Sequence, residues 1–295
     1  MQARRALLEG ILDYAGLFPP QALPLDEAVR TYGELRHHPH AWMLGRFVIP
    51  AGRLADLDPP EAWPLAVLLG RGADWLAALR EETSALAAFR ARQPDCPVEV
   101  AELAVPAGAP LEAGLDLLPP DLLVFCEPGW GAELEAGIAR LGALRGAGRP
   151  VALKLRTGGL KAEDHPEPEQ LARAMVAAAG AGVPMKFTAG LHQPVRHEAP
   201  GPGCRQFGFV GVFMAAMLAR DPGVPLEDLV ALLEEPRMGA FQARGELAWR
   251  HHRLAAERVW ELRQHVVGFG SCSFQEPLEA LVDAGWLSRT GGMEP

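Results

Sequence analysis

The stretch that decides the fold runs from Pro150 to His192. It reads VALKLRTGG over 151–159 and VPMKFTAGLH over 183–192, with an Ala-rich segment between them. The two ends are short and apolar, as strands are, and the segment 168–182 has a helical pattern of apolar residues. Strand, helix and strand in this order predict a βαβ unit with parallel strands. Lys154 and Lys186 would then lie at the same level of neighbouring strands, near their carboxyl ends.

Apolar segments of strand length continue on both sides of this unit, and nearly all of them are separated by segments with a helical pattern. Besides the two lysine strands, the expected strands are 10–15, 43–49, 65–69, 98–104, 122–126 and 266–271. Eight strands with intervening helices favour a (β/α)8 TIM barrel. The alternative is an open sheet of six or seven strands with a helical subdomain.

No linker or repeat divides the chain, so we expect one domain over 1–295. The connection between the seventh and eighth strands, 193–264, is unusually long for a barrel. We expect it to hold a loop followed by helices, and either to cover the barrel mouth or to make a contact in a homo-oligomer. The expected elements are a loop at 193–205, helices at 208–220, 226–235 and 240–264, and, after the last strand, a disordered tail at 290–295.

Composition excludes several classes of protein. The net charge of −9, without a basic run, argues against nucleic-acid binding. No apolar stretch is long enough to span a membrane, and the first residues do not resemble a signal peptide. Four scattered cysteines favour reduced thiols and a cytoplasmic location.

The scarcity of lysine makes the two strand lysines notable. The chain has only three lysines, Lys154, Lys161 and Lys186, and otherwise uses arginine. An ammonium group is costly to bury, and arginine cannot replace lysine as an amine nucleophile. The alternative is a lysine stem that packs along the strand with its head in solvent.

Amine chemistry is therefore one interpretation of the pair. Burial and mutual repulsion would lower the pKa of one lysine and leave a neutral amine. Such an amine forms an iminium with a carbonyl compound, and Glu102 or Asp13 could move the protons. This chemistry requires neither a metal nor an organic cofactor, and the expected partner is a small-molecule substrate.

Other polar residues come at the carboxyl ends of the expected strands, where TIM barrels hold their active sites. We expect them to bind an anionic or hydroxylated substrate. They are Arg46, Glu127, Arg156, Thr157, Thr188, His192, Ser271 and Ser273.

The order of several short motifs resembles the class I aldolases of the deoxyribose-phosphate aldolase type. The matching pieces are Ile11-Leu12-Asp13, Glu102-Leu103-Ala104-Val105-Pro106, Lys154-Leu155-Arg156-Thr157-Gly158, Lys186-Phe187-Thr188-Ala189-Gly190 and Phe269-Gly270-Ser271-Cys272-Ser273. The resemblance implies that Lys154 forms the Schiff base and that Lys186 lowers its pKa. It also implies a lyase that acts on a small, anionic or phosphorylated carbonyl compound.

The chain departs from the family's pattern at several positions. Arg156 stands where the family has a small polar residue, and Glu102 stands where it has Asp. The seventh strand ends in AGLH over 189–192 instead of GGIR, so a phosphate ligand is lost or replaced.

Two other functions remain open. A metal-dependent hydrolase or isomerase would use Glu102, Glu127, His192 and His197 as ligands. A non-catalytic barrel that binds a small metabolite would instead have Lys154 paired with Glu102 and no open pocket. The pair His251-His252 is interpreted as the surface of an amphipathic helix, not as a ligand pair.

Overall fold

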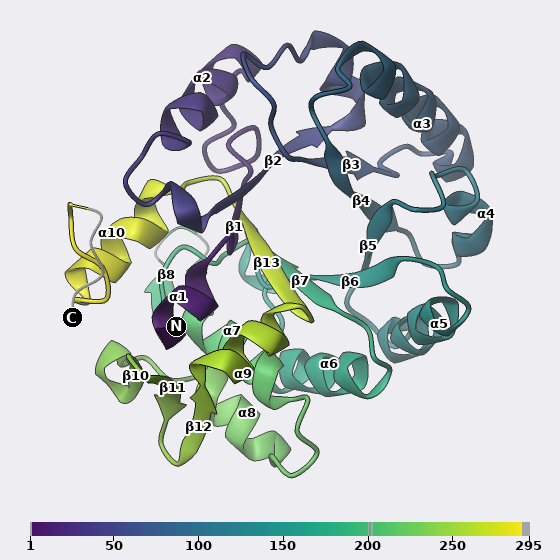
Figure 1. The fold of residues 1–295 in the computed structure, drawn as a ribbon. Coiled ribbons are helices and arrows are strands. Elements are labelled where there is room, and N and C mark those ends of the chain that lie inside the picture. Colours follow the sequence, from purple (N-terminus) through teal and green to yellow (C-terminus); the bar gives the residue numbers. More distant parts are fainter. Residues whose placement is uncertain (1, 200, 202, 291–295) are drawn as a thin grey trace.

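The computed structural model describes residues 2–199, 201 and 203–290. Eight parallel strands close into a barrel in the order β1-β13-β7-β6-β5-β4-β3-β2, and helices surround it (Figure 1). The TIM-barrel prediction is confirmed, and closure of the barrel excludes an open sheet. The barrel strands are β1 (Leu12–Tyr14), β2 (Leu44–Pro50), β3 (Leu65–Leu69), β4 (Val98–Val105), β5 (Leu123–Pro128), β6 (Val151–Arg156), β7 (Met185–Thr188) and β13 (Val266–Ser271).

The helices follow the strands in the expected places. They are α1 (Ala3–Leu8), α2 (Leu25–Leu35), α3 (Trp75–Arg92), α4 (Leu111–Leu115), α5 (Leu134–Gly146), α6 (Pro168–Gly180), α7 (Phe209–Leu218), α8 (Leu226–Leu233), α9 (Ala256–Arg263) and α10 (Gln275–Asp283). Short 3-10 turns cover Ala41–Met43, Ala51–Asp56, Ala162–Asp164 and Met238–Ala240.

Helix α6, which joins the two lysine strands, begins where its sequence specifies a start. Pro168 occupies the first turn, where its missing N–H costs no hydrogen bond. The backbone N–H of Glu167 donates to Gln170 Oε1 at 2.9 Å, and the Glu167 side chain accepts a hydrogen bond from the Gln170 backbone. This reciprocal capping satisfies donors at the helix start and fixes the crossover between β6 and β7.

Strand alternation divides the side chains between two layers. Side chains that point outward pack under the helices, as Phe187 and Phe269 pack against Phe213. Those that point inward include a small apolar cluster inside the barrel. Its buried members are Val48, Ala66, Leu68, Val100, Phe125 and Ala152.

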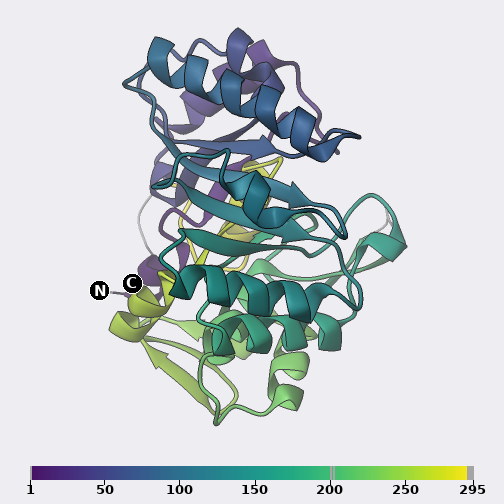
Figure 2. The same ribbon diagram turned by 90° about the vertical axis from the view of Figure 1, so that its right-hand side faces the viewer.

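The connection between β7 and β13 departs from the prediction in two places. The expected loop contains an antiparallel hairpin of β8 (His197–Ala199) and β9 (Cys204–Gln206). Figure 2 shows this hairpin on the side toward which the barrel strands run.

The expected helix over 240–264 is wrong except for α9. Its first part forms a three-stranded antiparallel sheet of β10 (Phe241–Ala243), β11 (Glu246–Trp249) and β12 (His252–Ala255). Burial alternates along β10, as a half-buried strand requires, and the sheet lies outside the barrel (Figure 1). The His251-His252 pair therefore lies at a hairpin turn, not on a helix.

Two other expectations bear on the described residues. None of their helices is both long and apolar enough to cross a membrane. All four cysteines are free thiols. The expected disorder of the tail concerns mainly 291–295, which lies outside the described residues.

The contact between β13 and α7 yields a stability prediction. The ring of Phe269 is fully buried and stacks on Phe209 at a centroid distance of 5.3 Å. Phe269→Ala should lower the free energy of unfolding by about 3–5 kcal/mol, because it leaves a cavity between strand and helix. Chemical denaturation measures this change.

Trp260→Ala is the matched control, because Trp260 is a large aromatic residue that remains 41 % exposed. We expect it to cost about 1 kcal/mol or less. Equal losses for the two variants would contradict the packing described for β13 and α7.

Candidate active site

Five ionisable side chains point into the barrel from five different strands. Asp13 comes from β1, Glu102 from β4, Glu127 from β5, Lys154 from β6 and Lys186 from β7. Lys154 and Lys186 are direct neighbours in the register of β6 and β7. The side chains of all five are at most 11 % exposed. The prediction that both lysines lie at one level on one face of the wall is confirmed.

Glu102 bridges the two lysines. Its Oε1 accepts a hydrogen bond from Lys186 Nζ, and its Oε2 lies 2.6 Å from Lys154 Nζ. Lys186 Nζ donates a second hydrogen bond to Asp13 Oδ2, and Lys154 Nζ lies 2.6 Å from Glu127 Oε2. Each ammonium group is thus held between two carboxylates, as a buried charge must be.

An arginine extends this arrangement at each end. Arg156 Nη1 lies 3.4 Å from Glu127 Oε1, and Arg46 Nη1 lies 3.6 Å from Asp13 Oδ2. The backbone N–H of Arg46 also donates to Asp13 Oδ1 at 2.7 Å. The resulting ion-pair chain consists of Arg156, Glu127, Lys154, Glu102, Lys186, Asp13 and Arg46.

The pKa shifts follow from these contacts. Burial alone would raise the pKa of Glu102. The charges of Lys154 and Lys186 have the larger effect and lower this pKa to about 2. Burial lowers the pKa of Lys186, but Asp13 and Glu102 raise it by more, so the net shift is upward. Repulsion between the two ammonium groups is therefore not the dominant effect on Lys186. A pairing of Lys154 with Glu102 was expected only for the metabolite-binding alternative, and a carboxylate that bridges both lysines was not predicted, because sequence alone does not show how far each side chain reaches into the barrel.

Only part of the ion-pair chain can be reached from outside. A cavity of 1110 Å³ opens at the barrel mouth, and Lys154, Glu102 and Arg156 line it. Asp13 and Lys186 do not line this mouth cavity. Lys154 is therefore the strand lysine that a ligand in the mouth can contact, and Lys186 lies behind it. Apolar side chains of Phe18, Val48 and Leu68 complete the inner wall, and β8 contributes His197, Glu198 and Ala199 at the rim.

The predicted substrate-binding residues divide into three groups: those at or directly behind the mouth, two hydroxyls that are used within the protein, and Arg46. Glu127 contacts Lys154, while Thr188, His192 and Ser271 line the mouth cavity together with Arg156.

Two predicted hydroxyls are used within the protein instead. Thr157 is fully buried, and its Oγ1 donates to the carbonyl of Ala189 at 2.6 Å. Ser273 Oγ accepts a hydrogen bond from the backbone N–H of Glu276 at 3.1 Å, which satisfies a donor at the start of α10. Neither residue lines the mouth cavity.

Arg46 was expected at the mouth, and this placement is wrong. It lines a different cavity together with Gly10, Pro64 and Glu99, which precede or begin strands β1, β3 and β4. Because the barrel strands are parallel, these residues mark the end opposite to the mouth. Arg46 is the third residue of β2, too early in the strand to reach the carboxyl end.

The ligands proposed for a metal at the mouth do not assemble around one point. His192 Nδ1 lies 2.8 Å from Glu276 Oε2, and His197 Nδ1 lies 3.0 Å from the carbonyl of Val195. Among the described residues, the one group of three ligand side chains close enough to share an ion is Asp228, His251 and His252.

Several residues of the mouth were not predicted from the sequence. Arg71, Lys161 and Gln206 line the cavity, but they come from loops and from the β8–β9 hairpin. Arg71 follows the end of β3 by two residues, so the rule used for the other strands would have found it. Lys161 lies five residues beyond the end of β6, in the loop before α6, and Gln206 ends β9 in the long connection after β7, so neither is close enough to a barrel strand end for that rule to find it.

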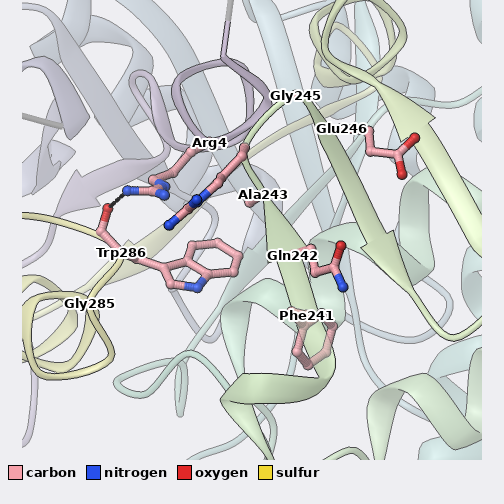
Figure 3. Close-up of a pocket in the computed structure, with 9 residues that line it drawn as sticks. Arg4, Phe241, Gln242, Ala243, Gly245, Glu246, Gly285 and Trp286 are labelled. Atoms are coloured by element: carbon pink, nitrogen blue, oxygen red, sulfur yellow. Dashed lines mark hydrogen bonds between the residues drawn. The ribbon is translucent and has the colours of Figure 1, made fainter. Parts of the chain in front are cut away.

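A second cavity, of 460 Å³, lies away from the barrel mouth between the β10–β11 hairpin and Trp286 (Figure 3). It is lined by Arg4, Phe241 and Glu246, among others, and holds none of the predicted site residues. The Arg4 guanidinium donates to the carbonyl of Trp286, which ties α1 to the segment after α10.

Comparisons with known proteins place the chain in no family. No family model matches it, and neither the curated proteins nor the solved structures contain a match. The inferences about its activity therefore depend on the geometry of the site.

The lowered pKa of Glu102 yields a prediction about stability and pH. Glu102→Gln should lower the free energy of unfolding by about 3–5 kcal/mol at pH 7, because it leaves two buried ammonium groups undercompensated. The ionised form of Glu102 stabilises the fold fully above its ordinary pKa of 4.5, and this contribution is lost as the pH falls toward about 2. The difference between wild type and variant should therefore narrow below pH 4.5.

Urea unfolding at several pH values measures this difference. Glu163→Gln is the control, because that carboxylate is 75 % exposed and its change should cost about 1 kcal/mol or less. A difference for Glu102→Gln that widens on acidification would mean that Glu102 is not held as a carboxylate.

Proposed function

We propose that this chain is a Schiff-base-forming lyase of the class I aldolase kind that acts on a small carbonyl compound. The observation that supports this most is the position of Lys154. Its side chain is buried but lines an open cavity, and its Nζ lies 2.6 Å from a carboxylate oxygen of Glu102 and 2.6 Å from one of Glu127. The resemblance to aldolases of the deoxyribose-phosphate type belongs to this proposal.

The first step is release of a proton from Lys154. Each of its two carboxylates has a second cation. Glu127 is the better acceptor, because its second cation, Arg156, is 42 % exposed and 3.4 Å away, whereas Glu102 contacts the fully buried Lys186. A substrate that enters the mouth covers the small part of the Lys154–Glu127 pair that is still exposed, 3 % and 11 % of the two side chains. Lower local polarity favours the neutral amine and carboxylic acid over the two ions.

The amine then attacks the substrate carbonyl and forms a carbinolamine. Glu127, now protonated, donates its proton to the leaving hydroxyl, and water departs as the iminium forms. Lys186 stays charged throughout, so Glu102 remains a carboxylate beside the iminium and stabilises its positive charge.

Cleavage of the carbon–carbon bond follows from the iminium. A carboxylate removes the proton of the hydroxyl on the β-carbon, and the carbon–carbon bond breaks to release an aldehyde. The electron pair of this bond forms the double bond of an enamine, and the iminium nitrogen becomes neutral. Protonation of the enamine and addition of water release the second carbonyl product and restore Lys154. The reverse sequence joins the two fragments.

Charges at the mouth suggest the class of substrate. Arg71, Arg156 and Lys161 line the cavity, and each offers a cation to an anionic substituent. Arg156 is 42 % exposed and directly follows Lys154 on the inward face, so it can bind an anionic group near the reacting carbon. A carboxylate or phosphate on the carbonyl compound fits this arrangement.

Borohydride trapping tests the proposal. The full-length protein is incubated with aldehydes and 2-keto acids in turn, reduced with borohydride, and examined by intact-mass and peptide mass spectrometry. We expect one stable adduct, on Lys154, from a carbonyl compound that carries an anionic group. Lys154→Arg should abolish the adduct, because guanidinium does not form a Schiff base.

Lys161→Arg is the matched control, because Lys161 also lines the cavity but is 72 % exposed. It should leave the adduct intact. An adduct that depends on Lys161, or none with any carbonyl compound, would refute the proposal. If a ligand nevertheless protects Lys154 from amine-reactive reagents, the metabolite-binding alternative gains support.

A further inference from the structure

A group of metal-binding side chains lies outside the barrel, apart from the mouth cavity. Asp228 belongs to α8, His251 to the turn between β11 and β12, and His252 begins β12. One ligand atom of each residue lies within 4.8 Å of the others. None of the three residues lines the mouth cavity, so the proposed lyase chemistry does not use them.

The distances suit a shared ion. Asp228 Oδ2 lies 2.9 Å from His252 Nε2 and 3.6 Å from His251 Nε2. In a tetrahedral zinc site, with bonds of about 2.0–2.1 Å, neighbouring ligand atoms are about 3.3 Å apart. The observed distances lie on either side of this value, so small rotations of the side chains suffice.

The hairpin turn brings two consecutive histidines to one side. Consecutive residues of a regular strand point to opposite faces, but Arg250 has a φ of 50° and reverses the chain just before the pair. The two imidazole rings lie 4.1 Å apart between centroids. A left-handed conformation costs a residue such as arginine about 1 kcal/mol or more, so surrounding contacts must support this turn.

Packing holds two of the three ligands in place. The His252 side chain is 9 % exposed and Asp228 is 22 % exposed. The ring of His252 lies nearly parallel to Trp249, whose Nε1 donates to Glu235 Oε2 at 3.2 Å. His251 is 73 % exposed, which leaves one side of the group open to an ion and to water.

We propose that Asp228, His251 and His252 form a binding site for a divalent transition-metal ion, such as zinc. Two imidazoles and one carboxylate are the ligands that zinc, nickel and copper prefer, whereas calcium and magnesium need more oxygen atoms. Three protein ligands leave a coordination position for water or for a group from another molecule.

The bound ion would join two parts of the structure. It would link α8 to the β11–β12 hairpin, in addition to the existing contact between His252 and Asp228. An ion that binds only the folded chain stabilises it according to its concentration. We therefore expect zinc to raise the thermal unfolding temperature without altering the lysine site.

Calorimetric titration of the metal-free, full-length protein with zinc tests the proposal. Wild type should bind one zinc ion at this site. Asp228→Asn and His252→Gln should each weaken that binding by at least about tenfold, since even groups behind a ligand contribute that much. The rise in unfolding temperature on addition of zinc should disappear in the same variants.

Two controls separate this site from other zinc ligands and from misfolding. Glu227→Gln removes the exposed neighbour of Asp228 on α8, and His37→Gln removes an exposed histidine elsewhere. Both should bind zinc as wild type does, and circular dichroism should show all four variants to be folded. If wild type and the four variants bind zinc equally, or if wild type binds none, the proposal is overturned.

Discussion

The bridge that Glu102 forms between two buried ammonium groups is the constraint on which the barrel interior depends. An isolated charge in a protein interior costs several kcal/mol or more, so each lysine needs a carboxylate within contact distance. Glu102 serves both lysines, and Asp13 and Glu127 each serve one. The five side chains need room, and small inward residues such as Ala66 and Ala152 provide it. The arrangement is cooperative, because loss of any member leaves its neighbours undercompensated.

The two lysines are neighbours in the register of β6 and β7, but only Lys154 lines the mouth cavity, and this difference assigns different roles to them. Lys186 does not line the mouth cavity. Of its two carboxylates, Asp13 does not line the cavity either, and Glu102 is shared with Lys154. Lys154 lines the mouth cavity and is paired with Glu127, which also meets the exposed Arg156. The inner lysine thus fixes the charge of Glu102, while the outer one is placed to meet a ligand. The proposed chemistry uses this division, since Glu102 can stabilise the positive charge of an iminium only while it stays ionised.

Sequence patterns predicted the barrel and the level of both lysines. Both predictions need only the positions of strands and helices along the chain, which the periodicity of apolar residues indicates. Sequence patterns failed where long-range geometry decides. Arg46 was expected at the mouth because its strand was known but its depth along the axis was not. The strands β10–β12 were mistaken for a helix, although the apolar residues at 241, 247 and 249 are an even number of residues apart and so fit the period of a strand. The pairing of Glu102 with both lysines also depends on which strands face each other across the barrel.

Nuclear magnetic resonance of protein labelled with ¹⁵N at the lysine side chains tests directly whether Lys186 is held as an ammonium group by Asp13 and Glu102. The chain has only three lysines, so a substitution at Lys161 and one at Lys154 assign all of the signals. A pH titration then reports the charge of each amine. We expect Lys186 to keep its ammonium form beyond about pH 10.4, the ordinary pKa of lysine, because Asp13 and Glu102 raise its pKa. A Lys186 amine that loses its proton near neutral pH would contradict the ion-pair chain.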